Sequence, residues 1–143
     1  GGVMHFEFTS KPNAKDIHET KSRVLEYNSK YLETVNESFV AIFVKDKEEA
    51  SVAGITGKIF GLWLEIEFLF VDEDQRGSGL GSKLLTSFEK EAMVLGCKYA
   101  FLNTFDFQAK DFYPRYGYKL AFELQNYPIS GTNSFFTKEL VSG

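Results

Sequence analysis

Runs of apolar residues along the chain predict a sheet of about seven strands. Residues 5–9 alternate weakly and predict a first strand, which Pro12 and Asn13 would end. Six longer runs predict strands at 39–44, 51–60, 62–71, 97–104, 118–123 and 134–140. The first three of these runs follow one another directly and predict an antiparallel meander. Gly54 and Gly57 interrupt the second of them, which indicates a bulge or a close neighbour.

Apolar residues at helical spacing predict helices between these strands. Residues 14–33 predict one or two helices, with a break near Asn28. A second apolar stripe consists of Leu80, Leu84, Leu85, Phe88, Ala92 and Leu95, and Gly96 is well placed as its C-terminal cap. Residues 107–116 predict a short helix, which Pro114 restricts. The resulting order, β-α(α)-β-β-β-α-β-α-β-β, predicts an α/β (α+β) fold in one domain spanning residues 1–143.

A glycine-rich loop joins the apolar strand 62–71 to the second helix. It contains Gly77, Gly79 and Gly81 within six residues, directly after an acidic turn. Glycines let backbone N–H groups approach a ligand closely, and a helix N-terminus carries a partial positive charge. The loop is therefore predicted to bind a pyrophosphate.

Two common phosphate-binding motifs fail against this loop. The nucleotide P-loop requires a glycine before its lysine, but Ser82 precedes Lys83. The dinucleotide fingerprint requires GxGxxG and an acidic residue about 20 positions later at the end of the next strand. The chain instead has GxGxG, and its next strand ends near Asn103. Neither motif explains the loop.

Composition narrows the class of protein. The 143 residues carry a net charge of −4 and no basic stripe, which argues against a nucleic-acid partner. A single cysteine excludes an internal disulfide framework, and His5 and His18 belong to no cluster of metal ligands, so no metal is expected. The sequence lacks an apolar run long enough for a membrane span and a signal peptide, so a cytoplasmic location is expected. Gly1 to Val3, before Met4, are interpreted as an expression remnant.

The stretch Arg76-Gly77-Ser78-Gly79-Leu80-Gly81 resembles the [RQ]xxGx[GA] motif of the GNAT superfamily of N-acetyltransferases. The segment from Asp111 to Tyr118 resembles the family's FYxxxG[FY] segment, and residues 102–109 are similar to the NTFxFQA stretch of some small bacterial members. The resemblance extends from about Phe39 to the last strand. It implies the GNAT fold, with a mixed central sheet, and a protein that binds acetyl-coenzyme A (acetyl-CoA). Members of this family often form homodimers, so the resemblance also implies a homodimer as a candidate assembly of this protein.

The resemblance also implies the residues that hold the cofactor. In the family, loop amides wrap the pyrophosphate, and pantetheine inserts where a bulge splays the central strand from its neighbour. Carried onto this chain, the cofactor-binding residues are Phe70, Val71, Arg76, Gly77, Ser78, Gly79, Leu80, Gly81, Ser82, Asn103, Phe112 and Tyr113. The backbone N–H near Val71 would polarise the thioester carbonyl. For Arg76, a phosphate contact and a structural role both stay open.

Two carboxylates and one tyrosine are the candidate catalytic residues. Glu65 and Glu67 lie on one face of an apolar strand by period two. A desolvated glutamate has a raised pKa, which suits a general base near pH 7. The resemblance supports both residues, so either glutamate could be the general base. The alternative is that both side chains lie on a solvent-facing surface of the strand and have no catalytic role. Tyr113 corresponds to the family residue that protonates the departing thiolate, or else packs against the cofactor tail.

The resemblance, together with these candidate residues, implies an N-acetyltransferase that moves an acetyl group from acetyl-CoA to a primary amine of a small molecule or peptide. Direct attack in a ternary complex is expected. The alternative is a non-catalytic module of the same fold that binds acyl-CoA as a sensor. The identity of the amine is not encoded in any motif of the chain.

Overall fold

The computed structural model of the protein describes residues 2–108 and 110–140. The chain divides into two compact units, Gly1–Val35 and Asn36–Gly143. The helices are α1 (Ala14–Asn28) and α2 (Leu80–Val94), with short 3-10 helices η1 (Glu73–Gln75) and η2 (Tyr113–Tyr116). The strands are β1 (Glu37–Lys45), β2 (Ser51–Phe60), β3 (Trp63–Val71), β4 (Tyr99–Phe105), β5 (Lys119–Gln125) and β6 (Thr132–Glu139).

In its described residues, 2–35, the first unit contains one helix, α1. Asn13 caps its start, because the side-chain oxygen accepts a hydrogen bond from the Asp16 amide at 2.8 Å. The helix ends at Asn28, where the sequence predicted a break. The predicted strand at 5–9 is wrong, since these residues form no strand and their side chains are exposed. A strand needs a neighbouring backbone to pair with, and a short alternating run alone does not supply one. Gly1, in the interpreted remnant, lies outside the described residues.

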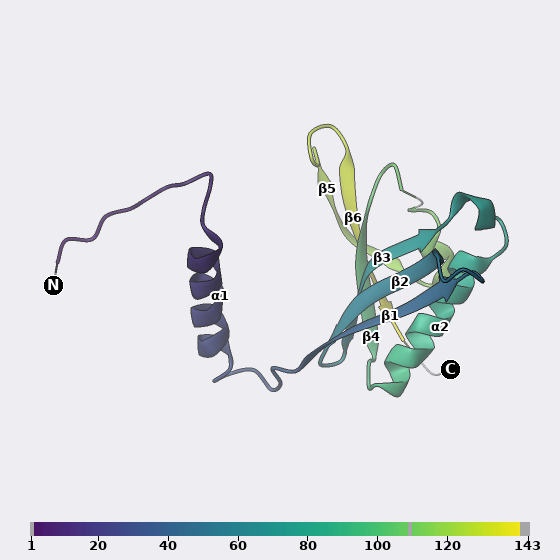
Figure 1. Ribbon diagram of the computed structural model, residues 1–143, viewed down its shortest axis with the longest axis horizontal. Helices are drawn as coiled ribbons and strands as arrows, with labels where there is room; N and C mark the ends of the chain where they lie inside the picture. Colours follow the sequence, from purple (N-terminus) through teal and green to yellow (C-terminus); the bar gives the residue numbers. More distant parts are fainter. Residues whose placement is uncertain (1, 109, 141–143) are drawn as a thin grey trace. The chain divides into compact units, whose positions relative to one another are not determined.

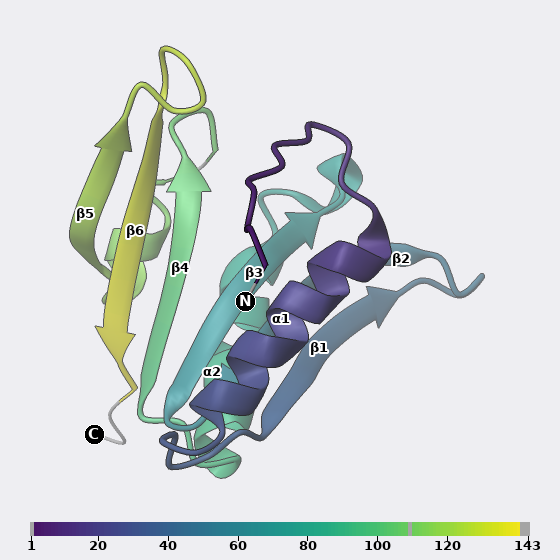
Figure 2. The ribbon, with the colours of Figure 1, turned by 90° about the vertical axis from the view of Figure 1, so that its left-hand side faces the viewer.

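The second unit is built on one mixed sheet, of six strands in the described part of the chain rather than about seven. The strand order is β1-β2-β3-β4-β6-β5 (Figure 2). The meander β1-β2-β3 is antiparallel, as the sequence predicted. β3 and β4 are parallel, because α2 carries the chain back across the sheet between them. β6 then pairs antiparallel with both β4 and β5.

Helix α2 lies along one face of this sheet and forms the core with it (Figure 1). Most of the predicted apolar stripe is the buried side of the helix, since Leu84, Leu85, Phe88 and Ala92 are at most 3% exposed. Leu95, also predicted in the stripe, lies just beyond the helix and is 61% exposed. They pack against buried sheet residues that include Ile55, Leu64, Leu102 and Phe136. Burial of these apolar surfaces, each worth about 1.5–3 kcal/mol for a full side chain, fixes the helix on the sheet. The position of its N-terminus relative to β3 follows from this packing.

The register between β2 and β3 shifts between Thr56 and Gly57. Gly57 pairs with Ile66 and Thr56 pairs with Phe68, so Glu67 is the extra residue of a β-bulge in β3. A Cβ at Gly57 would collide with the carbonyl oxygen of Glu65 and crowd the Phe88 ring. The glycine is therefore required by the close approach of the bulged strand, as its position in the sequence indicated.

We expect Gly57→Ala to destabilise the protein by about 2–3 kcal/mol, because the added methyl group must push backbone or core aside. Chemical denaturation followed by circular dichroism measures this. Gly54→Ala is the matched control in the same strand, since its Cβ would lie 3.4 Å from the Ile42 carbonyl oxygen and can be accommodated. Equal midpoints for the two variants would contradict this account of the bulge.

The predicted helix at 107–116 is wrong in length and type. Among the described residues of this range, only Tyr113–Tyr116 are helical, as the 3-10 helix η2, and residues 107–108 and 110–112 form turns or a bend. Pro114 is the second residue of η2, in the first turn, where its missing N–H is harmless. Gly117 caps the C-terminal end of η2 with φ +91°. Ala109, the last residue of the NTFxFQA-like stretch, lies outside the described residues. Neither helix described in the chain has the length and apolar character that a membrane crossing requires.

Candidate active site

The central parallel pair of strands separates halfway along its length. β3 and β4 pair only at Trp63↔Tyr99, Leu64↔Ala100 and Glu65↔Phe101. Beyond Glu65, the bulge at Glu67 bends β3 away, and Figure 2 shows the two strands diverging toward their C-terminal ends. A cleft of about 830 Å³ opens at this point. The sequence could not reveal the separation, because a bulge leaves no reliable residue pattern.

Two residues of β3 direct backbone groups into this gap. Val71 pairs with Ala53, and the next amide, of Asp72, donates to the Val52 carbonyl at 2.8 Å. In an antiparallel pair this pattern makes Val71↔Ala53 a non-hydrogen-bonded position. The N–H of Val71 therefore points away from β2, toward the side where β4 has departed. Leu69, two residues earlier, has the same orientation.

The glycine-rich loop forms the other end of the cleft. Gly77 and Gly79 have φ of +81° and +79°, a left-handed conformation that suits glycine. Gly79 is the N-cap of α2, and no side chain caps the helix there. In the described residues, no protein acceptor is found for the N–H groups of the residues from Gly77 to Ser82. Several amides are thus gathered without partners at a helix N-terminus that borders a cleft.

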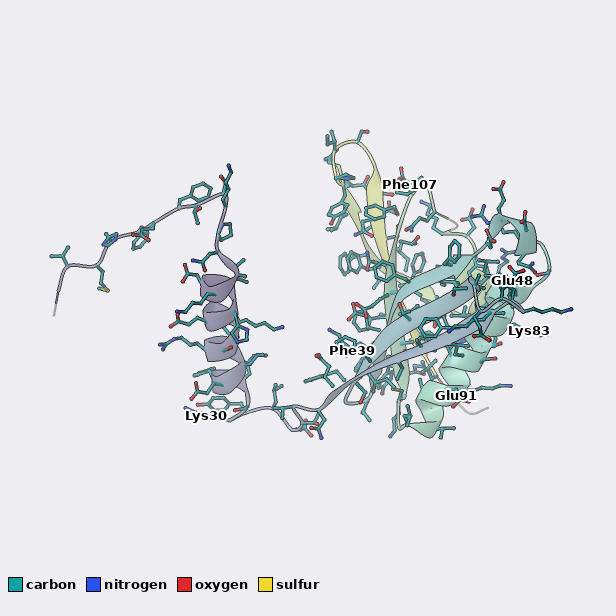
Figure 3. The ribbon with its side chains drawn as sticks, viewed as in Figure 1. Lys30, Phe39, Glu48, Lys83, Glu91 and Phe107 are labelled. Carbon is teal, nitrogen blue, oxygen red and sulfur yellow. The ribbon has the colours of Figure 1, made fainter. Side chains whose placement is uncertain are left out.

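Two arginines lie at this end, beside the acidic turn of η1. Arg76 and Arg115 line the cleft, and the first turn of α2 contains no acidic residue. Lys83 extends from that turn (Figure 3). Arg76 Nε donates to the Val71 carbonyl oxygen at 3.2 Å, so one N–H of its side chain ties the loop to the end of β3. This contact gives Arg76 a structural role and leaves its terminal guanidinium nitrogens available to a ligand.

The chemistry of this end fits a pyrophosphate. Unpartnered amides, a helix dipole and two guanidinium groups all favour a dianionic ligand. A Cβ on Gly81 would lie 3.7–3.8 Å from Val71 and Phe112 side-chain atoms, which places this residue against the wall of the cleft. The cleft then continues between β3 and β4, where residues of both strands beyond their last paired position line it.

The candidate acid Tyr113 lies in the aromatic wall of the cleft. Its ring contacts Phe112 edge-on at 5.1 Å and Tyr118 at 5.8 Å, while Tyr116 packs on Phe112 at 4.9 Å. Burial raises the pKa of Tyr113 above its ordinary value. Its hydroxyl therefore stays protonated across the neutral range and can donate a proton. No protein hydrogen-bond partner of this hydroxyl is found among the described residues.

The structure separates the two candidate carboxylates. Both lie on the face of β3 opposite the buried Leu64 and Ile66, as the spacing predicted. Glu67 lines the cleft, is exposed, and has no ion-pair or hydrogen-bond partner within the described range. Glu65 lies outside the cleft lining and forms an ion pair with Lys58 at 3.6 Å. Glu67 is exposed and Glu65 is half-buried, so which of the two carboxylates is the base stays a prediction.

The remaining candidate residues are placed as follows. Those lining the cleft are Phe70, Val71, Arg76, Gly77, Gly79, Leu80, Gly81, Ser82, Asn103, Phe112 and Tyr113. Ser78 is absent from this lining, and its hydroxyl donates to the Gln75 carbonyl at 2.6 Å. Asn103 is partly engaged, because its Nδ2 donates to Asn133 Oδ1 at 3.1 Å.

Sequence reasoning missed two groups of residues near the cleft. Gln108 lines it and receives hydrogen bonds from Thr104 (3.0 Å) and from the Phe105 amide (2.7 Å). Behind Tyr113, the buried Glu89 bonds to Tyr118 and Lys138. Glu89 and Lys138 are 49 residues apart, and no local spacing brings them together. In the described part of the chain, no three His, Cys, Asp or Glu side chains are grouped to hold a metal ion.

Known proteins share this architecture. A family model described as "Acetyltransferase (GNAT) family" matches residues 5–118. The blasticidin-S acetyltransferase of Streptomyces morookaense is 41% identical over 88 residues, which are 61% of this chain and 65% of that protein, so the match spans just under two thirds of the relative. An acetyltransferase of Agrobacterium fabrum, Atu2258, is 28% identical over 115 residues, covering 80% of this chain and 84% of the relative. The crystal structure of an acetyltransferase from Bacillus cereus superposes with a TM-score of 0.84 at 31% identity, covering 93% of this chain and 97% of the other.

Proposed function

Because the chain belongs to the acetyltransferase (GNAT) family, in its small bacterial type, we propose that it transfers an acetyl group from acetyl-CoA to a primary amine. The observation that carries the proposal is the continuous cleft from the glycine loop to Glu67, with β3 and β4 separated along it. The family uses acetyl-CoA, and the α+β fold of six strands and two helices is GNAT-like. Direct attack in a ternary complex fits a cleft that reaches both a phosphate-binding end and a free carboxylate.

In this proposal, the cofactor is held mainly by backbone. The amides of the residues from Gly77 to Ser82 bind the pyrophosphate, and Arg76 and Arg115 add charge. The slot beside Leu69 and Val71 takes the pantetheine arm, whose amides can pair with the free groups of β3. Bound acetyl-CoA supplies an activated acetyl thioester near the Val71 N–H. This N–H donates to the carbonyl oxygen and stabilises the negative charge that develops there.

Two side chains then act as the general base and the general acid. Glu67, directly or through a water molecule, accepts a proton from the acceptor ammonium so that its nitrogen can attack. Tyr113 donates its hydroxyl proton to the sulfur as the carbon–sulfur bond breaks. The second proton that the nitrogen loses as the amide forms passes to solvent, and exchange with solvent then returns Tyr113 to its protonated and Glu67 to its ionised form. Glu65 is the weaker candidate for the base, because its pairing with Lys58 holds it outside the cleft.

An acceptor screen tests the function. Acetyl-CoA is mixed with a panel of amines, and release of free thiol is followed by colour development. Blasticidin S heads the panel, because the relative named for its acetylation is 41% identical to this chain over the matched residues. Aminoglycosides, polyamines and lysine peptides complete it. Calorimetry on acetyl-CoA alone separates the outcomes: binding without turnover on any amine would favour the acyl-CoA sensor, and no binding at millimolar concentration would refute both functions.

We expect Glu67→Gln to lower kcat about 100-fold at pH 7, near the lower end of the range for general-base catalysis. The deficit should shrink as pH rises toward the pKa of the acceptor amine, because the amine then loses its proton without help. Initial rates between pH 6 and 10 measure this. Glu65→Gln is the matched control and should keep kcat within about threefold. The reverse ranking of the two variants would assign the base to Glu65.

A further inference from the structure

A buried polar cluster lies behind the aromatic wall of the cleft. Glu89 on α2 is 6% exposed, and its two carboxylate oxygens have separate partners. Oε2 accepts a hydrogen bond from the Tyr118 hydroxyl at 2.7 Å, and Oε1 accepts one from Lys138 Nζ at 2.8 Å. Lys138 also lies over the Tyr118 ring, 5.4 Å from its centroid. The carboxylate is therefore fully partnered inside the protein, which is the condition for keeping a charge buried.

The cluster joins three elements of the second unit. Glu89 comes from the middle of α2, whose N-terminus carries the phosphate-binding loop. Lys138 comes from β6, where it pairs with Ala100 of β4. Tyr118 follows η2, the short helix that begins with Tyr113. Burial and the Glu89 carboxylate raise the pKa of Tyr118 well above its usual range, so the phenol remains the donor in this bond.

Tyr118 is coupled to Tyr113 in two ways. The rings meet edge to face at 5.8 Å, and the Tyr118 amide donates to the Tyr113 carbonyl at 3.3 Å. Gly117 lies between them in the chain and adopts φ +91°. A Cβ added to Gly117 would lie 3.4 Å from the nearest methylene carbon of Lys138, so the Lys138 side chain packs against this glycine. A four-residue 3-10 helix has little stability of its own. Its orientation therefore depends on what anchors its C-terminal end.

We infer that Glu89, bonded to Tyr118 and Lys138, is a positioning residue that sets where Tyr113 stands relative to the phosphate-binding end of α2. The same helix then fixes both ends of the cofactor: its N-terminus holds the pyrophosphate, and Glu89 holds the turn that presents the proton donor. A displacement of about 1 Å at a reacting group lowers rates by up to about 100-fold, so such an anchor has a measurable effect on catalysis. The inference rests on the proposed role of Tyr113.

A double-mutant cycle tests it. We expect Glu89→Gln to lower kcat about tenfold while KM for acetyl-CoA stays within twofold, because the loop at the helix N-terminus is untouched. In a Tyr113→Phe background, the same change should lower kcat by less than twofold, since no proton donor remains to be positioned. Equal losses of kcat in both backgrounds would show a general structural role and overturn the inference. Full kcat in Glu89→Gln, or in Tyr113→Phe itself, would overturn it too.

A second measurement does not depend on activity. Amide hydrogen exchange at Gly117 and Tyr118, whose N–H groups bond to Pro114 and Tyr113, should accelerate at least tenfold in Glu89→Gln, with β1 and β2 amides unchanged. Unchanged exchange at these two amides would contradict the anchor even if no acceptor amine were known. This readout separates a failure of the inference from a failure of the proposed function.

Two further variants provide controls. Glu91→Gln changes the same residue type two positions along α2, where Figure 3 shows the side chain projecting from the helix, and should leave kcat and exchange unaltered. Tyr118→Phe keeps the ring against Tyr113 and removes only the hydroxyl. It should reproduce the lower kcat and the faster amide exchange. If Glu89→Gln does not fold, Tyr118→Phe takes its place in the double-mutant cycle with Tyr113→Phe. An unaltered Tyr118→Phe would contradict the proposed route from Glu89 to Tyr113.

Discussion

Gly79→Val is expected to abolish measurable acetyl-CoA binding. Gly79 has φ +79° at the N-cap of α2, and valine there would be strained by about 1–2 kcal/mol in the left-handed region. The loop would relax to another conformation and withdraw several amides from the pyrophosphate. Each hydrogen bond from these amides to a charged ligand contributes about 1.5–3 kcal/mol. Loss of two of them weakens binding by more than about 100-fold, which isothermal titration calorimetry measures.

Gly96→Val is the matched control for backbone strain. Gly96 has φ +102° just beyond the other end of α2, and nothing lies within 4 Å of its added Cβ. Both valine variants should therefore lose similar stability in thermal unfolding. Only Gly79→Val should lose acetyl-CoA binding. A Gly79→Val protein that binds acetyl-CoA like the parent would refute the assignment of this loop to the pyrophosphate.

Tyr113→Phe is expected to lower kcat about 1000-fold on a good acceptor, in the middle of the range for general acid catalysis. The ring and its contacts with Phe112 and Tyr118 remain, so acetyl-CoA should bind as before. Only the proton for the departing sulfur is lost. Steady-state rates of thiol release give kcat, and calorimetry gives the cofactor affinity.

The pH dependence of this loss follows from the sign of the pKa shift. An ordinary tyrosine titrates near pH 10, and burial raises the pKa of Tyr113 further. The parent enzyme keeps its proton donor throughout pH 6–9, so the ratio of parent to variant kcat should be constant there. Tyr116→Phe removes a hydroxyl from the same short helix and should retain kcat within about threefold. A ratio that collapses below pH 9 would exclude Tyr113 as the acid.

Local sequence patterns predicted much of the fold and the position of the glycine loop at the start of α2. The longer apolar runs located all six strands of the sheet, and the stripe from Leu80 to Ala92 located α2 with its buried side. These patterns gave wrong predictions where a strand has no neighbouring strand to pair with, and where a helix is cut short by the residues around it. Residues 5–9 alternate but pair with nothing in their own unit, and Pro114 and Gly117 limit the predicted third helix to one 3-10 turn. Alternation and spacing report local preference, whereas pairing and packing decide whether an element forms.

The sequence by itself determined the chemistry available to this protein: a glycine loop at a helix start, a tyrosine in a separate motif, and two carboxylates in one strand. Only the tertiary structure decided where these groups lie relative to one another. The extra residue at Glu67 bends β3 away from β4, which opens the cleft, turns the Val71 N–H toward it and leaves Glu65 paired with Lys58 outside it. The bond from Tyr118 to Glu89 likewise joins distant parts of the chain. Such contacts depend on strand register and helix packing, which no local spacing encodes.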